Sequence, residues 1–382
     1  MTTDEQQPAV IGSLKRFKVA GFRRLVDVDV ELGPLNILIG SNGCGKTSFL
    51  DAIEMMARTL KRDLKSFIAE LGGFGQIVSS GLQAKGIEIQ ADLIHPEAQV
   101  HYSLKVDSYG YGHSVKAESL EMTFSDQNRE EGYKLSHKFP SNSLVAEARQ
   151  PIEEAPSIYW VGDADFKLIS LLRNTINISS ISTARRASVR SPQRLSPVMW
   201  HSADGSDLFI RLLDIQQRDP ERYQSILEVL KIAFPSFERL ELQIVGDGYI
   251  GLYWHEVHLK QPLGAGQLSD GILRFLWLLS VLYHPDCPAV VLFDEPESHF
   301  HPQLIQIMIA VFRECSSWTQ IIATTHSPTI VRFIKPEELL VMDMNENGLA
   351  TIQRASNLNL AHWLEDFNLD EIWSMGRLTE QA

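Results

Sequence analysis

The sequence predicts an α/β fold with a mixed, mostly parallel central sheet, and three observations support this prediction. Residues 35–39 are a short apolar run suited to a buried strand, and an amphipathic helix is expected from Thr47. A glycine-rich loop, residues 40–47, connects that strand to that helix. From Ser269 onward the pattern alternates between helix and strand, as it does in βα units.

The glycine-rich loop matches the phosphate-binding pattern G-x-x-x-x-G-K-[ST] at every fixed position. Its glycines allow the backbone to approach an anion closely, and the N-terminus of the following helix favours negative charge. Lys46 can place a positive charge on the β- and γ-phosphates, and the Thr47 hydroxyl can bind Mg²⁺. The alternative is a glycine-rich turn before an ordinary helix. The predicted nucleotide-binding residues are Gly40, Ser41, Asn42, Gly43, Cys44, Gly45, Lys46, Thr47 and Ser48.

A second candidate motif is an acid pair at the end of an apolar strand. Residues 289–293 form that strand, and Asp294 and Glu295 follow it. Buried parallel strands deliver their last residues to the sheet edge where ligands bind. We therefore expect Asp294 to hold Mg²⁺ and Glu295 to polarise an attacking water, although acids after a strand are often only helix caps.

Two further segments have both a structural and a functional interpretation. Ser269 precedes a strongly apolar helix over residues 272–283. It could cap that helix, or Gly271 and the helix N-terminus could form an anion site. His326 follows an apolar strand, residues 320–323, where a histidine is more often structural than catalytic.

Composition limits the class of protein. The chain has 382 residues, enough for one large α/β domain or two smaller ones, and its net charge of −13 argues against a general basic coat. Its 3 cysteines suggest neither a disulfide framework nor a zinc site. Residues 1–7 do not resemble a signal peptide, and the apolar run 272–283 is too short to span a bilayer. We expect a cytoplasmic protein without a membrane partner.

The remaining chain divides by pattern. One helix is expected from Thr47 to about Leu71. Further expected parts are an antiparallel β-layer over residues 86–140, a mainly helical insert over 141–265, and an acidic segment over 336–382 that packs on the head or on a partner. Within the insert, helices are expected over 208–217 and after Asp219-Pro220, followed by short strands over 240–245 and 249–254.

Taken in order, these residues resemble the ATP-binding-cassette class of ATPases. The most similar branch is the soluble one: RecF-like repair proteins, chromosome-maintenance (SMC) heads and AAA-type ATPases of the overcoming-lysogenization-defect (OLD) kind. Phe22-Arg23-Arg24 resembles the opening turn of the family, residues 268–271 its signature loop, residues 294–302 its acid pair plus D-loop, and His326 its switch histidine. The resemblance covers nearly the whole chain and implies a single head over residues 1–382.

The resemblance also implies a mechanism. Two heads would sandwich ATP, with Ser269 and Gly271 of one subunit on the γ-phosphate held by Lys46 of the other. Glu295 would be the general base, with Lys46 and His326 assisting, and the cofactors would be ATP and Mg²⁺. The implied task is a conformational switch or DNA clamp in DNA repair or phage defence, acting with a separate effector protein. Alternatives are an ATP-bound DNA-binding scaffold with little turnover and the cytosolic motor of a transporter. Asp270 and Ile272 depart from the transporter signature and disfavour the motor.

Two assignments stay open in the sequence. The lid glutamine of the family corresponds either to Gln76 or to Gln150. Residues 166–203 contain six basic residues and no acid, which suits either a DNA backbone contact or a solvated loop. The candidate DNA contacts in this stretch are Arg185, Arg186, Arg190 and Arg194. Related defence ATPases continue into a nuclease domain, which this chain is expected to lack.

Overall fold

The computed structural model describes most of the chain, and the described residues form two compact units. They are residues 13–61, 63–79, 86–95, 98–109, 112–124, 134–139, 176–178, 181–195, 205–358 and 369–374. Unit 1 comprises residues 1–177, 288–292 and 316–382, and unit 2 comprises residues 178–287 and 293–315. The second unit therefore extends beyond the predicted insert and includes the apolar helix that follows Ser269.

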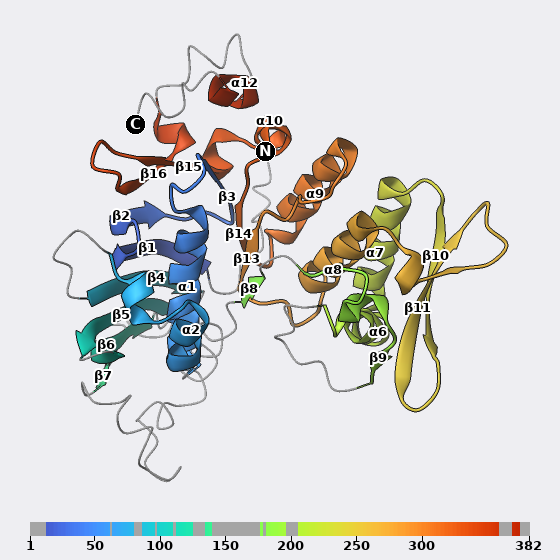
Figure 1. The fold of residues 1–382 in the computed structure, drawn as a ribbon, viewed down its shortest axis with the longest axis horizontal. Helices are drawn as coiled ribbons and strands as arrows, with labels where there is room; N and C mark the ends of the chain where they lie inside the picture. The colour runs from blue at the N-terminus through green and yellow to red at the C-terminus, as the bar shows by residue number, and fades with distance from the viewer. Residues whose placement is uncertain are drawn as a thin grey trace, which may run out of the picture. The chain divides into compact units, whose positions relative to one another are not determined.

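Unit 1 contains an antiparallel sheet in the order β2-β1-β4-β5-β6-β7. Its strands are β1 (Ser13–Phe22), β2 (Leu25–Glu31), β4 (Gly86–His95), β5 (Ala98–Tyr109), β6 (Gly112–Phe124) and β7 (Lys134–Phe139). Alternate residues of β1, such as Phe17 and Val19, are fully buried, as expected for a sheet with one covered face. Helix α1 (Lys46–Leu60) lies beside these strands (Figure 1). Its Phe49 packs edge-to-face on Phe17 of β1, with 5.6 Å between the ring centroids.

A second sheet has the order β16-β15-β3-β14-β13-β8. Its strands are β3 (Leu35–Gly40), β8 (Ile176–Ile178), β13 (Val290–Asp294), β14 (Gln320–Thr324), β15 (Leu339–Met344) and β16 (Ala350–Arg354). Strand β3 runs parallel to both β14 and β15, and all of its residues are buried, as is typical of a central parallel strand. Part of the acidic segment 336–382 is thus built into the sheet, because its apolar run 339–342 pairs with β3.

The fully buried side chain of Gln320 connects these two sheets within unit 1. The backbone N–H of Leu14 donates to Gln320 Oε1 at 2.8 Å. In return, Gln320 Nε2 donates to the carbonyl oxygens of Leu14 at 2.9 Å and Gly33 at 2.7 Å. A buried amide must satisfy its hydrogen bonds inside the protein, so this residue fixes the start of β14 against β1.

The helices of unit 1 differ from the sequence prediction at one place. Those in the described residues are α1, α2 (Leu64–Glu70), α3 (Phe74–Ile77), α10 (Pro328–Phe333) and α12 (Leu369–Ser374), with short 3-10 helices η5 (Pro336–Glu338) and η6 (Ala355–Asn357). The prediction of one helix from Thr47 to Leu71 is wrong. The chain turns before Asp63, whose N–H donates to the carbonyl of Arg58 at 2.8 Å and whose carboxylate pairs with the Arg58 guanidinium. The apolar periodicity continues across this turn and therefore does not reveal it.

Unit 2 combines helices with a small antiparallel sheet. Its elements are η3 (Ser188–Arg190), β9 (Gln193–Arg194), α6 (Leu208–Arg218), α7 (Pro220–Ala233), β10 (Phe237–Ile244), β11 (Tyr249–Glu256), β12 (Leu263–Gly264), η4 (Ala265–Gln267), α8 (Asp270–Leu282) and α9 (Pro302–Cys315). The predicted cap at Asp219 is confirmed, since its carboxylate accepts from the N–H of Arg222 at 3.0 Å. In the part of the chain that the structure describes, no helix is long and apolar enough to cross a membrane.

A buried histidine follows α8 in unit 2. His284 is fully buried, and its Nδ1 accepts a hydrogen bond from the backbone N–H of Asp286 at 3.1 Å. Its Nε2 lies 3.1 Å from Asp214 Oδ2. The pKa of His284 is lowered to about 4, chiefly because burial disfavours the charged imidazolium. The folded protein therefore holds this ring neutral, with the proton on Nε2.

Acid should destabilise the fold through His284. The unfolded chain binds a proton at this histidine below about pH 6.5, whereas the folded chain resists protonation until about pH 4. We expect the free energy of unfolding to fall between pH 7.5 and pH 5 through this group, because the unfolded chain gains a proton there and the folded chain does not. Urea unfolding of the wild type and of His284→Gln at both pH values measures it, and an equal loss in both proteins would contradict the assignment.

Candidate active site

The glycine-rich loop joins β3 to α1 within unit 1. Gly43 and Gly45 adopt φ angles of 79° and 116°, which residues other than glycine rarely adopt. Gly45 caps α1 without a side-chain hydrogen bond. Ser41 and Asn42 are exposed. The first N–H groups of the helix are therefore suited to receive an anion.

The loop also packs directly on strand β15. A Cβ atom at Gly40 would lie 2.2 Å from the carbonyl oxygen of Met342, and one at Gly45 would lie 3.0 Å from the Met342 methyl carbon. Cys44 is fully buried below the loop, and burial raises the pKa of its thiol. The thiol therefore stays protonated and adds no negative charge beneath a phosphate site.

Lys46 lies inside the curve of the loop. It is only 5% exposed, and its Nζ donates to the carbonyl oxygens of Gly40 at 2.8 Å and Ser41 at 3.0 Å. Thr47, the next residue, is exposed at the start of α1. A positive charge, a helix N-terminus and a hydroxyl in this order fit a nucleoside triphosphate, and the Thr47 hydroxyl is a suitable oxygen ligand for Mg²⁺.

Arg23, in the predicted opening turn, is tied to the same helix. Its Nη1 lies 2.6 Å from Asp51 Oδ2 and 3.4 Å from Ser48 Oγ, both on α1. Its backbone has φ 48°, and its N–H donates to the carbonyl of Ile77 at 2.7 Å. The turn therefore holds the first half of α1, a contact over 28 positions that no local pattern indicates.

His326 leaves the sheet beside the glycine-rich loop. Strand β14 pairs with β3 so that Thr324 stands opposite Leu38, and the N–H of Thr325 donates to the Leu38 carbonyl at 2.9 Å. The N–H of Ser327 donates to the Thr325 hydroxyl at 2.9 Å, which fixes the turn on both sides of the half-buried His326. Unit 1 thus brings the loop and this histidine to the ends of neighbouring strands.

The acid pair follows β13 and belongs to unit 2. Asp294 ends the strand, and both acids are half-buried. Glu295 adopts φ 48°, in the left-handed region, and its carbonyl accepts from the N–H of Ser298 at 3.1 Å in a tight turn. Such a backbone costs about 1–3 kcal/mol in a residue other than glycine and is concentrated at functional positions.

The segment around Ser269 packs on the segment that follows the acid pair. The Ser269 hydroxyl accepts from the N–H of Ile272 at 3.3 Å, so the capping role is confirmed, and the serine remains exposed. A Cβ at Gly271 would lie 3.3 Å from the carbonyl oxygen of His299, and the rings of Phe275 and Phe300 pack edge-to-face at 5.8 Å. Gly271 therefore permits a close approach between these two backbones.

The other predicted residues are placed as follows. Gln76 is exposed on α3, whereas Gln150 lies outside the described residues. Arg185, Arg186 and Arg194 are exposed, but the Arg190 side chain is only 12% exposed and is ion-paired with Asp270. Arg190 is thus committed to an internal contact and does not fit an external DNA contact.

Among the residues that the structure describes, no group of three or more His, Cys, Asp or Glu side chains is arranged to hold a metal ion.

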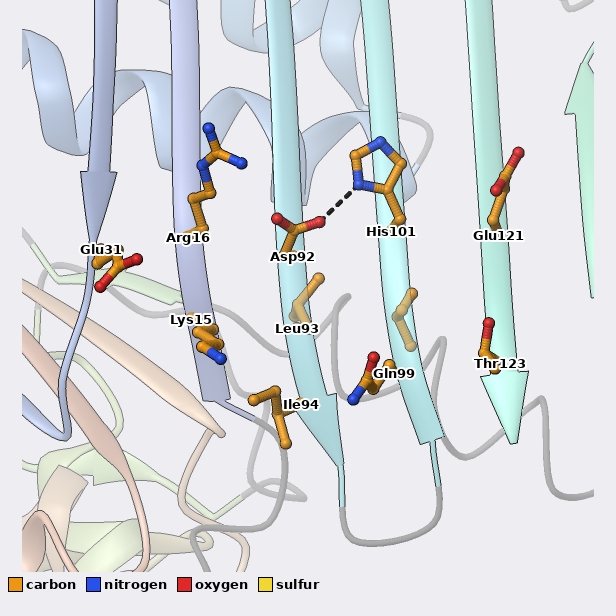
Figure 2. A pocket seen from close by; sticks show the side chains of 11 residues that line it. Lys15, Arg16, Glu31, Asp92, Leu93, Ile94, Gln99, His101, Glu121 and Thr123 are labelled. Atoms are coloured by element: carbon orange, nitrogen blue, oxygen red, sulfur yellow. Dashed lines mark hydrogen bonds and ion pairs between the residues drawn. The ribbon is translucent and has the colours of Figure 1, made fainter. Parts of the chain in front are cut away.

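Unit 1 carries a separate groove of about 450 Å³ on its antiparallel sheet (Figure 2). In register across the strands stand Arg16, Asp92, His101 and Glu121, and His101 Nδ1 lies 2.6 Å from Asp92 Oδ1. Charges of both signs line this groove, and none of the predicted site residues does. The groove is a polar face of the antiparallel sheet, and no residue of the glycine-rich loop lines it.

Comparison with protein families gives one match over most of the chain. The profile of the family described as "AAA domain, putative AbiEii toxin, Type IV TA system" matches residues 35–332. Two curated relatives match over short stretches. The OLD nuclease of Thermus scotoductus is 46% identical over 54 residues, 14% of this chain and 10% of the relative. The Septu protein PtuA of Bacillus thuringiensis is 30% identical over 87 residues, 23% of this chain and 22% of the relative. The matches thus span under a quarter of each relative.

Solved structures support the fold. An Smc head bound to the C-winged helix domain of ScpA superposes with a TM-score of 0.57 and 14% identity, covering 92% of this chain and 99% of that one. An Smc head with an extended coiled coil from Pyrococcus furiosus, bound to the C-terminal domain of ScpA, gives a TM-score of 0.53 and 13% identity over 93% and 99% of the two chains. At this identity the likeness establishes the fold alone.

Replacing Lys46 by alanine should weaken ATP binding. The change removes a charge-assisted contact with the phosphates, so we expect a loss of about 10- to 100-fold in affinity. Calorimetry with ATP measures the loss, and Lys15→Ala, an exposed lysine on β1, is the matched control. An affinity within twofold of the wild type, in a Lys46→Ala protein that melts normally, would rule out the loop as the nucleotide site.

Proposed function

Because the chain belongs to the family of AAA domains described as putative AbiEii toxin, Type IV TA system, and has the fold of an SMC head, we propose that it binds and hydrolyses ATP with Mg²⁺ as an ATP-dependent dimer. Family and fold identify it as an ATPase of the ATP-binding-cassette-like AAA kind, as the sequence resemblance predicts. The observation that carries the proposal is the buried Lys46 ammonium, held in the glycine-rich loop at the N-terminus of α1.

The proposed reaction is attack of water on the γ-phosphate. Glu295 accepts a proton from the water while the water oxygen bonds to the γ-phosphorus. The bond between the γ-phosphorus and the β–γ bridging oxygen breaks, which releases ADP and phosphate. Lys46 neutralises charge on the phosphates, and His326 stands on the neighbouring strand end as an assisting group. Thr47 and Asp294 would hold Mg²⁺, which supplies further charge neutralisation when bound.

The proposed dimer uses the N-terminus of α8. Ser269 is exposed there, and Gly271 is half-buried at the start of the helix, so the hydroxyl and the first backbone N–H groups of α8 can face a phosphate. In a two-fold sandwich, Ser269 and Gly271 of one subunit would face the triphosphate bound by Lys46 of the other. Each site then consists of residues from both chains.

The proposed biological task is a conformational switch or DNA clamp in DNA repair or phage defence, acting with a separate effector and located in the cytoplasm. The likeness to proteins named OLD nuclease and Septu protein PtuA supports this setting. Arg185, Arg186 and Arg194 are the remaining candidate DNA contacts, because their exposed side chains can reach a phosphate backbone. ATP turnover with and without duplex DNA distinguishes a clamp from a switch that ignores DNA.

Glu295→Gln should bind ATP and hydrolyse it slowly. The amide keeps the shape of the side chain but cannot accept the proton, so we expect turnover to fall by about 10²- to 10⁴-fold and the ATP-held dimer to accumulate. Light scattering after size-exclusion chromatography with ATP measures the dimer. Glu256→Gln, a half-buried glutamate at the end of β11, is the control. A monomeric Glu295→Gln protein with wild-type turnover would refute both the base and the dimer.

Mixing two inactive variants should restore activity. A dimer of one Lys46→Ala chain and one Ser269→Arg chain keeps one site with an intact loop and an intact signature segment. In an equimolar mixture about a quarter of all sites are then intact, so we expect up to about a quarter of wild-type turnover. Labelled chains report subunit exchange. Exchange without any recovery of turnover would argue against shared sites.

A further inference from the structure

Arg190 makes a three-way connection inside unit 2. Its Nη1 donates to the carbonyl oxygen of Leu268 at 2.7 Å, and its Nε donates to the carbonyl oxygen of Thr183 at 2.8 Å. Its Nη2 pairs with the carboxylate of Asp270. The guanidinium therefore joins the segment before η3 to the two residues that flank Ser269.

The surroundings leave Arg190 little freedom to move. Its side chain is only 12% exposed, and its own carbonyl oxygen would lie 3.5 Å from a Cβ at Gly266 in η4. The planar guanidinium donates to three separate acceptors at fixed angles, so it holds them in place better than the flexible ammonium of a lysine would. Leu268 and Asp270 are thus held on either side of the exposed Ser269, at the N-terminus of α8.

Asp270 poses an electrostatic problem that Arg190 solves. An acid in the first turn of a helix is favourable for the helix itself, but its charge opposes a phosphate approaching the same end. Asp270 is 45% exposed, so its charge would reach such a ligand. Pairing with Arg190 offsets that charge while leaving Ser269 and Gly271 accessible.

We propose that Arg190 is a positioning residue for ATP-driven dimerisation: it holds the Leu268–Asp270 backbone in place and neutralises Asp270, so that the N-terminus of α8 can accept the γ-phosphate of ATP bound by a second copy of this chain. The inference rests on the proposed function, since that function supplies the phosphate. Arg190 itself touches no substrate. Its role is confined to the half of the site that one subunit offers to the other.

The test uses Arg190→Ala, Asp270→Asn and the double variant, each in the Glu295→Gln background, with the full-length chain. We expect Arg190→Ala to weaken ATP-driven dimerisation by at least about 10-fold, because several charge-assisted bonds are lost and Asp270 loses the guanidinium that it is paired with. ATP binding to the monomer should stay within twofold. Asp270→Asn alone should dimerise at least as well as the parent, and the double variant should recover much of the loss. Arg218→Ala, which removes a different arginine paired with two aspartates in unit 2, is the control and should leave dimerisation unchanged.

Two readouts separate this inference from the proposed function. If Glu295→Gln with native Arg190 fails to dimerise with ATP, the proposed function fails. Hydrogen exchange on the monomer still tests the positioning role, because Arg190→Ala should raise exchange at residues 268–273 by about 10-fold and Arg218→Ala should not. Unchanged exchange in Arg190→Ala would overturn the positioning role. Dimerisation that is equally weak in Arg190→Ala and the double variant would overturn charge neutralisation.

Discussion

The contact between the Gly40 backbone and the carbonyl of Met342 constrains the glycine-rich loop and the strands on either side of it. A Cβ at position 40 would lie 2.2 Å from that oxygen, well inside contact distance, so only glycine fits without a shift of β15. Strand β3 lies between β14 and β15, and its register with both decides where the glycine-rich loop begins. Lys46 and His326 depend on that register for their places. The chemistry proposed for this loop therefore rests on close packing between two backbones.

In unit 2, too, a glycine allows two backbone segments to pack closely. Gly271 allows the start of α8 to approach the carbonyl of His299, and the rings of Phe275 and Phe300 extend the contact. The Ser269 segment and the segment after Glu295 are therefore parts of one packed unit. A change in either backbone is transmitted to the other through atoms already in contact. The packing thus places the N-terminal turn of α8 against the turn that follows Glu295.

The sequence predicts the local features well, because each depends on neighbouring residues. The glycine-rich loop, the Asp219 cap and the β10–β11 hairpin all follow from short patterns and are present. The contacts that sequence reasoning misses are long-range. Gln320 reaches Leu14 over 306 positions, and Arg190 reaches Leu268 over 78. Nothing in the local pattern distinguishes Arg190 from the exposed arginines beside it, and only burial and its three acceptors reveal the difference. The break before Asp63 is missed because apolar periodicity records a buried face and not the path of the backbone.

Glu295 shows how backbone and side chain can place opposite demands on one position. Its φ of 48° is a conformation that glycine adopts freely, whereas the proposed proton transfer needs a carboxylate. Selection for stability alone would favour glycine at this position and would remove the proposed base. A search for more heat-resistant forms of this chain should therefore leave position 295 unchanged, because Glu295→Gly would raise the free energy of unfolding and lower ATP turnover.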